Sequence, residues 1–388
     1  MYIHRILQKE LEASLQNKKV LLLLGARQVG KTTLIEQLQS QYQGQLLNMD
    51  IDVDRARIAS ASKLAPQEAM RALGASSLLV IDEAHRAPNI GRITKGWYDA
   101  KVKPKIILLG SSSATLLDIA SAELTGRNEK FWLTPFLFQE ILGQKSWWAP
   151  GQSPKIIQQD FKDQVDALML QRLVYGNYPE AYTTADTQKY LDNLSSDYLL
   201  KDIFTESKIR SPEDVRRLLR ELANEIGNTV TVLQLATRLK LSRQTITKYL
   251  QLLESIFIIF SVPSYSTDPF KEINKSQKYY FWDNGVKNAI QRQWEISEHR
   301  GDINQLWQNW VMAEIFKQSK TFNRQEELFF WETRNGSKVD LIVRQGSEIH
   351  PFQIAYFKNE ANSSRAFTNA YQKNPTIIHP GNILEILQ

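Results

Sequence analysis

The chain has 388 residues, of which 42% are hydrophobic and 23% are charged, and this balance excludes a disordered or fibrous protein. It contains no cysteine and only 5 histidines, so disulfides, thiolate metal sites and cysteine nucleophiles are excluded as well. The formal net charge of +6 is compatible with nucleic acid binding but does not indicate it.

Membrane and targeting signals are not apparent in the sequence. The densest apolar runs, residues 20–24 and 256–260, are far shorter than the ~20 residues that a membrane-spanning helix needs. Residues 1–16 alternate charged side chains with apolar ones at helical spacing, unlike a secretory signal. We therefore expect a cytoplasmic protein without a membrane partner.

The first part of the chain, residues 1–150, is predicted to be one α/β domain. Short apolar runs alternate there with helical patterns, which is typical of a parallel sheet with helices on both faces. The expected strands are residues 20–24, 46–49, 78–81 and 106–109, and the clearest helices are 32–41 and 66–73. Residues 147–154, WWAPGQSP, break the pattern and mark a linker.

Residues 25–32, GARQVGKT, match the pattern G-x-x-x-x-G-K-[ST] of a phosphate-binding loop. An apolar strand precedes the loop and a helix follows it, so its N–H groups and the helix's positive end can face phosphates. Lys31 is expected to reach the β- and γ-phosphate oxygens, and the Thr32 hydroxyl to bind Mg²⁺. The predicted nucleotide-binding residues are Gly25, Ala26, Arg27, Gln28, Val29, Gly30, Lys31, Thr32 and Thr33.

Two carboxylates follow the third predicted strand. Asp82 stands where an acidic residue would hold Mg²⁺, through water, and Glu83 suits the base that orients the attacking water. The alternative is that the pair only caps the next helix.

Candidates for completing the site follow the fourth strand. Ser111 and Ser112 come at the strand's carboxyl end, where doubly wound sheets bind ligands. Either could contact the γ-phosphate or the attacking water, although a plain polar loop explains each nearly as well. Arg127 is the candidate that stabilises transition-state charge, in its own chain or in a neighbouring subunit. An ordinary surface arginine is the equal alternative.

The run Asp82-Glu83-Ala84-His85, together with residues 113–115, also spells two signatures of nucleic-acid helicases. Those enzymes need a second α/β domain that clamps the nucleotide. After Trp148 the chain turns helical and offers no such series of strands and helices, so we do not expect a helicase.

The middle of the chain is predicted to be helical. Residues 155–224 show amphipathic stretches at 161–173 and 190–203, with a turn at 176–179. Residues 232–253 then form two helices of helix-turn-helix length, with Ser242 as the second helix's N-cap.

The second of these helices would expose polar and basic side chains that can contact phosphates and bases in a major groove. They are Arg243, Gln244, Thr245, Thr247 and Lys248. A protein-docking module built on the same two helices is the alternative. Beyond them, the last ~90 residues combine a long helix, 303–320, with strands at 328–333, 339–344 and 350–357.

Together these segments resemble a family of prokaryotic AAA+-type P-loop ATPases. In that family the carboxyl half, formerly a domain of unknown function, combines a winged helix with a PD-(D/E)XK nuclease-like fold. The resemblance is carried by residues 25–34, 82–83, 110–112, 124–127, 133–140, 175–180, 201–203, 278–281 and 283–285. Leu137 departs from the family, which has serine there.

The resemblance implies an α/β architecture in four parts: a P-loop AAA+-like domain at 1–150, a helical lid at 151–228, a winged helix at 229–295 and a nuclease-like domain at 296–388. It implies that the phosphate-loop residues, with Lys31, Thr32, Asp82 and Glu83, bind and hydrolyse ATP, and it extends to Arg127.

The nuclease-like region departs from its pattern at the residues that would cleave. By resemblance, Glu314 on the long helix and Asp340 on a strand would hold metal. The expected Glu-x-Lys is Gln353-Ile354-Ala355, and Lys358 would point to the other face of a strand. We therefore expect a nuclease fold without activity, left to bind nucleic acid or a protein partner.

The function expected from the sequence is Mg²⁺-dependent ATP binding and hydrolysis that switches the winged-helix and nuclease-like region. That region would bind DNA or a protein partner. The alternative is a nucleotide-gated binding or scaffold protein with negligible turnover. A homo-oligomer is an open expectation, because AAA+ relatives often complete their site with a neighbour's arginine.

Overall fold

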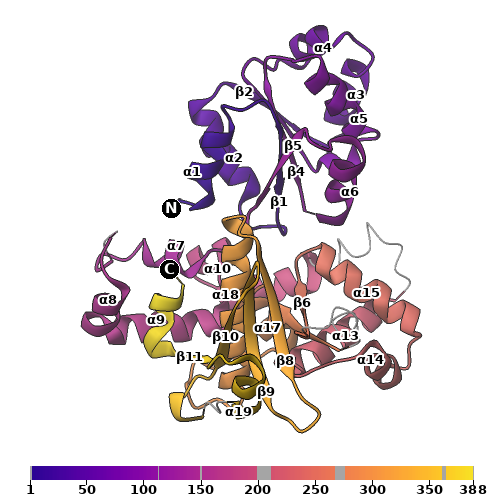
Figure 1. Cartoon of the computed structure of the whole chain (residues 1–388). Coiled ribbons are helices and arrows are strands. Elements are labelled where there is room, and N and C mark those ends of the chain that lie inside the picture. The colour runs from indigo at the N-terminus through magenta and orange to yellow at the C-terminus, as the bar shows by residue number, and fades with distance from the viewer. Residues whose placement is uncertain are drawn as a thin grey trace.

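The computed structural model describes residues 2–111, 113–148, 151–198, 211–266, 276–360 and 364–387. Figure 1 shows the N-terminal α/β domain standing above the rest of the chain. Below it, the C-terminal sheet and a long helix occupy the centre, with helices of the middle region on either side.

The N-terminal domain is built on a parallel sheet, as the sequence predicts. Its strands are β1 (Val20–Leu24), β2 (Gly44–Asn48), β3 (Leu78–Asp82), β4 (Lys105–Gly110) and β5 (Asn128–Trp132). They lie in the order β2-β3-β4-β1-β5 and every pair is parallel. All residues of β1 and β3 are buried, because helices cover both faces of the sheet.

The helices of this domain follow the predicted alternation. They are α1 (Leu7–Ser14), α2 (Lys31–Gln41), α3 (Asp52–Ala61), α4 (Pro66–Leu73), α5 (Ile90–Asp99), α6 (Ser113–Glu123) and α7 (Phe138–Leu142), with a 3-10 turn at Ala84–Arg86. The strand β5 is absent from the sequence prediction. Its only buried side chain is Phe131, so this edge strand shows no apolar run.

The middle region is helical up to a small hairpin. Its elements are α8 (Pro154–Asp160), α9 (Lys162–Tyr175), α10 (Pro179–Thr183), α11 (Thr187–Asn193), a π turn at Leu194–Tyr198, α13 (Pro212–Asn224), α14 (Val232–Leu239), α15 (Arg243–Ser255), β6 (Ile259–Pro263), β7 (Gln277–Phe281) and α17 (Asn284–Gln291). The strands β6 and β7 are antiparallel. The predicted helical segment 190–203 runs beyond the described residues at its end, and the family segment 201–203 lies wholly outside them.

The two helices predicted at 232–253 are α14 and α15. Ser242 caps α15 as expected, because its Oγ accepts the N–H of Thr245 at 3.0 Å. The helix α17, within the predicted winged-helix segment, packs on α9 of the predicted lid. The boundary between these two parts therefore stays a prediction.

The C-terminal part combines a long helix with a mixed sheet. Its elements are α18 (Ile303–Thr321), β8 (Glu326–Glu332), β9 (Lys338–Gln345), β10 (Glu348–Ile354), α19 (Arg365–Tyr371), β11 (Thr376–Ile378) and α20 (Ile383–Ile386), with 3-10 turns at Lys358–Glu360 and Pro380–Asn382. The order is β11-β10-β9-β8, parallel only between β10 and β11. The predicted strand 350–357 ends earlier, at Ile354, so Lys358 lies in a 3-10 turn.

One buried apolar cluster runs through all these parts, from Ile3 to Leu387. Two tryptophans of the predicted linker, Trp147 and Trp148, pack against it, and Trp147 stacks on Phe161 with ring centroids 5.4 Å apart. Residues 149 and 150 of that linker lie outside the described chain. Among the described residues, no helix is both long and apolar enough to span a membrane.

Candidate nucleotide-binding site

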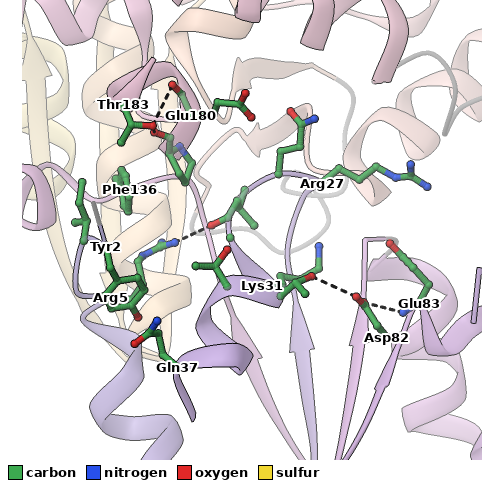
Figure 2. Close-up of a pocket in the computed structure, with 17 residues that line it drawn as sticks. Tyr2, Arg5, Arg27, Lys31, Gln37, Asp82, Glu83, Phe136, Glu180 and Thr183 are labelled. Atoms are coloured by element: carbon green, nitrogen blue, oxygen red, sulfur yellow. Dashed lines mark hydrogen bonds between the residues drawn. The ribbon is translucent and has the colours of Figure 1, made fainter. Parts of the chain in front are cut away.

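The predicted phosphate loop joins the carboxyl end of β1 to the start of α2 (Figure 2). Its backbone needs glycine at two places. A Cβ on Gly25 would lie 2.1 Å from the carbonyl oxygen of Leu133, and Gly30 has φ of +92°. The sequence motif therefore folds into the tight turn that brings its N–H groups together.

Lys31 is the first helical residue after the loop, and its side chain is folded back over it. The ammonium Nζ donates to the carbonyl oxygens of Gly25, at 2.8 Å, and Ala26, at 2.9 Å. Lys31 is buried, with 7% of its surface exposed. The ammonium thus lies at the mouth of the loop.

Thr32 and Asp82 meet between α2 and the end of β3. The Thr32 hydroxyl donates to Asp82 Oδ2 at 3.3 Å, and the N–H of Glu83 donates to Asp82 Oδ1 at 2.9 Å. Burial and the Glu83 carboxylate raise the pKa of Asp82, while the Lys31 ammonium acts in the opposite direction.

These two side chains fit a magnesium ion that also binds phosphate. A hydroxyl and a carboxylate are oxygen ligands of the kind that Mg²⁺ uses together with phosphates and water. In the part of the chain that the structure describes, no group of three or more acidic or histidine side chains is arranged so that it could hold a metal ion. The geometry therefore fits a metal held jointly by protein and nucleotide, not by the protein alone.

Glu83 is held by the neighbouring strand. Its Oε2 accepts from the Ser111 hydroxyl at 3.1 Å and from the Ser111 N–H at 3.3 Å, and His85 Nδ1 lies 3.4 Å away. The backbone of Glu83 is left-handed, with φ of +47°. The structure thus brings Ser111 to Glu83, whereas Ser112 lies outside the described residues. His85 was not expected here, although it belongs to the Asp-Glu-Ala-His run.

Arg127 does not lie at this site. Its carbonyl oxygen accepts the N–H of Val20, so it stands at the amino ends of β1 and β5. The phosphate loop follows the carboxyl end of β1, about 16 Å away at ~3.3 Å per residue. The Arg127 side chain binds Asp99, with Nε to Oδ1 at 2.7 Å. A role in its own chain's site is therefore wrong, and a role in a neighbouring subunit stays a prediction.

The loop and the carboxylates border a cavity of about 670 Å³. Gln37 of α2 and residues distant in sequence close it: Tyr2, Ile3, Arg5, Phe136, Pro179, Glu180 and Thr183. Figure 2 shows Phe136, Glu180 and Thr183 on the side of the cavity opposite Asp82. Sequence reasoning placed Phe136 and the turn before Thr183 in family-like blocks but assigned them no part in the site.

The helical region also contacts the loop directly. Tyr190, on α11, donates its hydroxyl hydrogen to Gln28 Oε1 at 2.9 Å. Gln28 has a left-handed backbone, with φ of +62°, which is uncommon for a residue with a side chain. The predicted lid therefore touches the phosphate loop as well as the cavity.

The residues expected to form a second metal site do not come together. Asp340 accepts from the N–H of Ile354 at 3.0 Å and from the amide of Gln353. The α18 side chain beside it is Gln308, with Nε2 at 3.4 Å. Glu314 binds the N–H of Phe138 instead. Glu314 lies six residues after Gln308 on α18, which turns the helix by ~600° and advances it by ~9 Å. The two side chains therefore lie on different faces at different heights, and the expectation that Glu314 lies beside Asp340 is wrong.

Comparisons with known proteins agree with this description. Residues 17–142 match a family model described as an AAA domain, and residues 166–295 and 304–385 match models described as domains of unknown function (DUF8612 and DUF4143). Uncharacterized proteins of Mycobacterium bovis and Mycobacterium tuberculosis are 25% identical to this chain, covering 89% of it and 72% of their own length.

An uncharacterized protein of Haemophilus influenzae is 22% identical, covering 65% of this chain and 59% of its own length. Among solved structures, a Walker-type ATPase of Pyrococcus abyssi superposes with a TM-score of 0.52 at 18% identity, covering 75% of this chain and 96% of its own. At this identity the likeness concerns the fold.

Proposed function

We propose that this chain, whose residues 17–142 have the P-loop ATPase fold of the AAA+ type, binds ATP with Mg²⁺ and hydrolyses it to ADP and phosphate. One observation carries the proposal. Lys31 and Thr32 follow β1, and Asp82 and Glu83 stand at the end of β3, with β4 between the two strands. All four residues line a single cavity of about 670 Å³.

Each of these side chains has a task in the reaction. The Lys31 ammonium exchanges the loop carbonyls for β- and γ-phosphate oxygens, beside the N–H groups that begin α2. Thr32 and Asp82 would hold the metal, which would supply positive charge beside the transferred phosphoryl group. Glu83 accepts a proton from the water that attacks the γ-phosphorus while the bond to the ADP oxygen breaks.

Ser111 and Arg127 complete the proposal. Ser111 orients Glu83, because its hydroxyl and its N–H both donate to the same carboxylate oxygen. Arg127 stabilises transition-state charge in the site of a second copy of this chain. Its side chain is 34% exposed at the far edge of the sheet, so it is accessible to a neighbour in a homo-oligomer.

A Glu83→Gln variant tests hydrolysis. We expect ATP to bind but to turn over at least ~10²-fold more slowly, because the amide cannot accept the proton. The matched control is Glu180→Gln, which removes another carboxylate lining the cavity and leaves the attacking water's partner in place. Phosphate release and nucleotide affinity are measured for both.

Unchanged phosphate release in Glu83→Gln would reject the role of Glu83. Tight ATP binding by the wild-type protein, without phosphate release in the presence or absence of duplex DNA, would instead favour a nucleotide-gated scaffold.

The proposed output of the cycle is a switch in the rest of the chain. Phe136 lines the nucleotide cavity, and its carbonyl oxygen accepts from Asn177 at 3.0 Å and from Lys317 of α18 at 2.9 Å. The next turn, at Phe138, is bound by Glu314 of α18. Movement at the cavity can therefore reach the C-terminal part through buried hydrogen bonds.

DNA is the proposed partner of α15. This helix exposes Arg243, Gln244, Thr247, Lys248 and Gln251, and their spacing places them on one face. Within α15 the only carboxylate, that of Glu254, is half-buried and bound by Ser261. Thr245, expected on the same face, is half-buried and pairs its hydroxyl with Ser242 at 2.8 Å. A basic, amide-rich face of this kind suits a phosphate backbone and base edges.

Reversing charge on this face tests DNA binding. Arg243→Glu with Lys248→Glu should weaken duplex binding at least ~10-fold and flatten its salt dependence, because phosphate contacts release counterions. Lys63→Glu with Arg92→Glu, on exposed residues of the N-terminal domain, changes the net charge equally and should leave binding unchanged. Equal binding by the α15 variant and wild type would favour a protein partner.

We also propose that the C-terminal domain does not cleave nucleic acid. The Gln353 amide donates to Asp340, and Ala355 offers no cation for an attacking water. Metal-dependent cleavage that disappears in Asp340→Ala would contradict this.

A further inference from the structure

One arginine of the N-terminal segment, Arg5, lines the cavity and also contacts the backbone of the phosphate loop. The Arg5 side chain is 5% exposed, and its Nη1 donates to the carbonyl oxygen of Val29 at 2.8 Å. Its Nη2 donates to the carbonyl of Thr134 at 2.6 Å, and its Nε contacts both carboxylate oxygens of Glu140, at 3.1 and 3.2 Å. The guanidinium carbon also lies 4.9 Å from the centre of the Phe136 ring.

Glu140 anchors this arginine. Its carboxylate also accepts the N–H groups of Ile6, at 2.7 Å, and Leu137, at 2.9 Å. Buried on all sides, with 1% of its side chain exposed, it fixes the guanidinium plane. The remaining donors of Arg5 are then aimed at two carbonyl groups, one of them in the phosphate loop.

The contact to Val29 sets the direction of the next N–H group. The Val29–Gly30 peptide bond is trans, since no cis bond occurs among the described residues. In a trans peptide the N–H points opposite to the C=O, so the Gly30 N–H is turned away from Arg5. Figure 2 shows Arg5 on one side of the loop and Lys31 on the other. The Gly30 N–H therefore faces the side on which the phosphates would lie.

This peptide is the part of the loop that most needs fixing. Glycine tolerates both signs of φ, so Gly30 allows the Val29–Gly30 unit to rotate and turn its carbonyl toward the phosphates. A carbonyl in that position would repel them. Arg5 opposes this rotation, because the rotation would break the charge-assisted hydrogen bond from Arg5 to the carbonyl oxygen of Val29.

We propose that Arg5 is a positioning residue for the phosphate cradle, holding the Gly30 N–H toward the β-phosphate of the bound nucleotide. This inference rests on the proposed nucleotide binding. Lysine cannot replace it, because one ammonium cannot meet Val29, Thr134 and Glu140 in the planar geometry of a guanidinium. Arg5 acts through the loop backbone and does not touch the reacting atoms.

The test compares ADP with AMP, which lacks the β-phosphate. Calorimetric dissociation constants are measured for wild type and Arg5→Lys. We expect the preference for ADP over AMP to fall at least ~10-fold, the scale of one lost charge-assisted hydrogen bond, with AMP affinity nearly unchanged. Arg57→Lys is the matched control. Arg57 likewise joins a carboxylate, of Asp54, and a carbonyl, of Leu73, but lies away from the loop.

A second variant distinguishes a loss of positioning from a loss of the folded state. Arg5→Gln with Glu140→Gln removes both buried charges together, so neither is left unpaired, and should lower the preference for ADP by a similar factor. Thermal unfolding checks that each variant is folded.

Two results would overturn the inference: a wild-type preference for ADP in both folded variants, or an equal loss of AMP and ADP affinity, which indicates a purely structural role. A wild-type protein that binds neither ATP nor ADP would instead refute the proposed function on which the inference rests.

Discussion

At the scale of single residues, Asp82 is held in an environment that disfavours its charge. Burial and the adjacent Glu83 raise its pKa, and Lys31 offsets this only partly. The folded state thus binds the Asp82 proton more tightly than the unfolded chain does. By linkage, this carboxyl lowers stability as the pH rises through its raised folded pKa. A bound cation would offset the unfavourable burial of the Asp82 carboxylate, as expected of a preorganised cation site.

Asp82→Asn should therefore stabilise the protein in the absence of nucleotide. We expect the free energy of unfolding to rise by about 1 kcal/mol at pH 7, on the scale of stabilising changes at functional sites. The gain should shrink as the pH is lowered, because the wild-type carboxyl then takes up its proton. Denaturant unfolding at several pH values measures this. A loss of stability at neutral pH would contradict it.

At the scale of elements, the turn between α9 and α10 joins the helical region to α17. Gly176 has φ of +64°, and a Cβ there would lie 1.9 Å from Asp283 Oδ1. Asp283 also accepts the N–H of Asn177 at 2.5 Å and caps α17 through Gly285 and Val286. The turn and the helix cap therefore share one buried carboxylate.

Gly176→Ala should lower the free energy of unfolding by more than ~3 kcal/mol, because it combines a left-handed backbone with a clash against a buried cap. Gly126→Ala is the matched control: its φ is +74°, with no atom within 4 Å of the added Cβ. That change should cost only about 1–2 kcal/mol. Equal effects of the two substitutions, measured by denaturant unfolding, would show that the Asp283 contact is unimportant.

At the scale of the whole molecule, Glu314 joins the C-terminal part to the segment beside the nucleotide cavity. It is 1% exposed and accepts from the Phe138 N–H at 3.0 Å, from Asn177 Nδ2 at 2.9 Å and from Lys317. Burial raises the pKa of Glu314, and Lys317 acts in the opposite direction. The C-terminal part is thus joined to Phe138 of the N-terminal domain and to Asn177 of the helical region through one buried carboxylate.

Glu314→Ala should destabilise the protein by about 3–5 kcal/mol, because it leaves Lys317 buried and uncompensated. It should also weaken ATP binding, since Phe136 in the cavity shares Lys317 through its carbonyl. The control is Glu348→Ala: its side chain is 64% exposed in a pair with Lys373 and should cost under ~1 kcal/mol. Unfolding and ATP titrations test both, and wild-type ATP affinity in a folded Glu314→Ala protein would argue against coupling.

The phosphate loop and the pair Asp82–Glu83 could be located from the sequence, because the geometry of each depends on residues close together in the chain. Each follows a buried strand, and the carboxyl ends of parallel strands share one edge. Even the closeness of Ser111 to Glu83 follows from that rule. The strand β5 escaped prediction because only one of its side chains is buried, so its sequence carries no apolar run.

Long-range partners could not be read in this way. Arg5 reaches Glu140, and Glu314 reaches Phe138, across more than a hundred residues. The helix α18 is buried nearly all round, so its periodicity did not tell which face meets Asp340. The chemistry of the phosphate loop and of the acidic pair depends on residues that are adjacent along the chain, so the sequence alone identifies it. The residues that surround the site come from distant parts of the chain, and only tertiary packing brings them together. Packing also decides which face of a helix buried on all sides, such as α18, contacts a given partner.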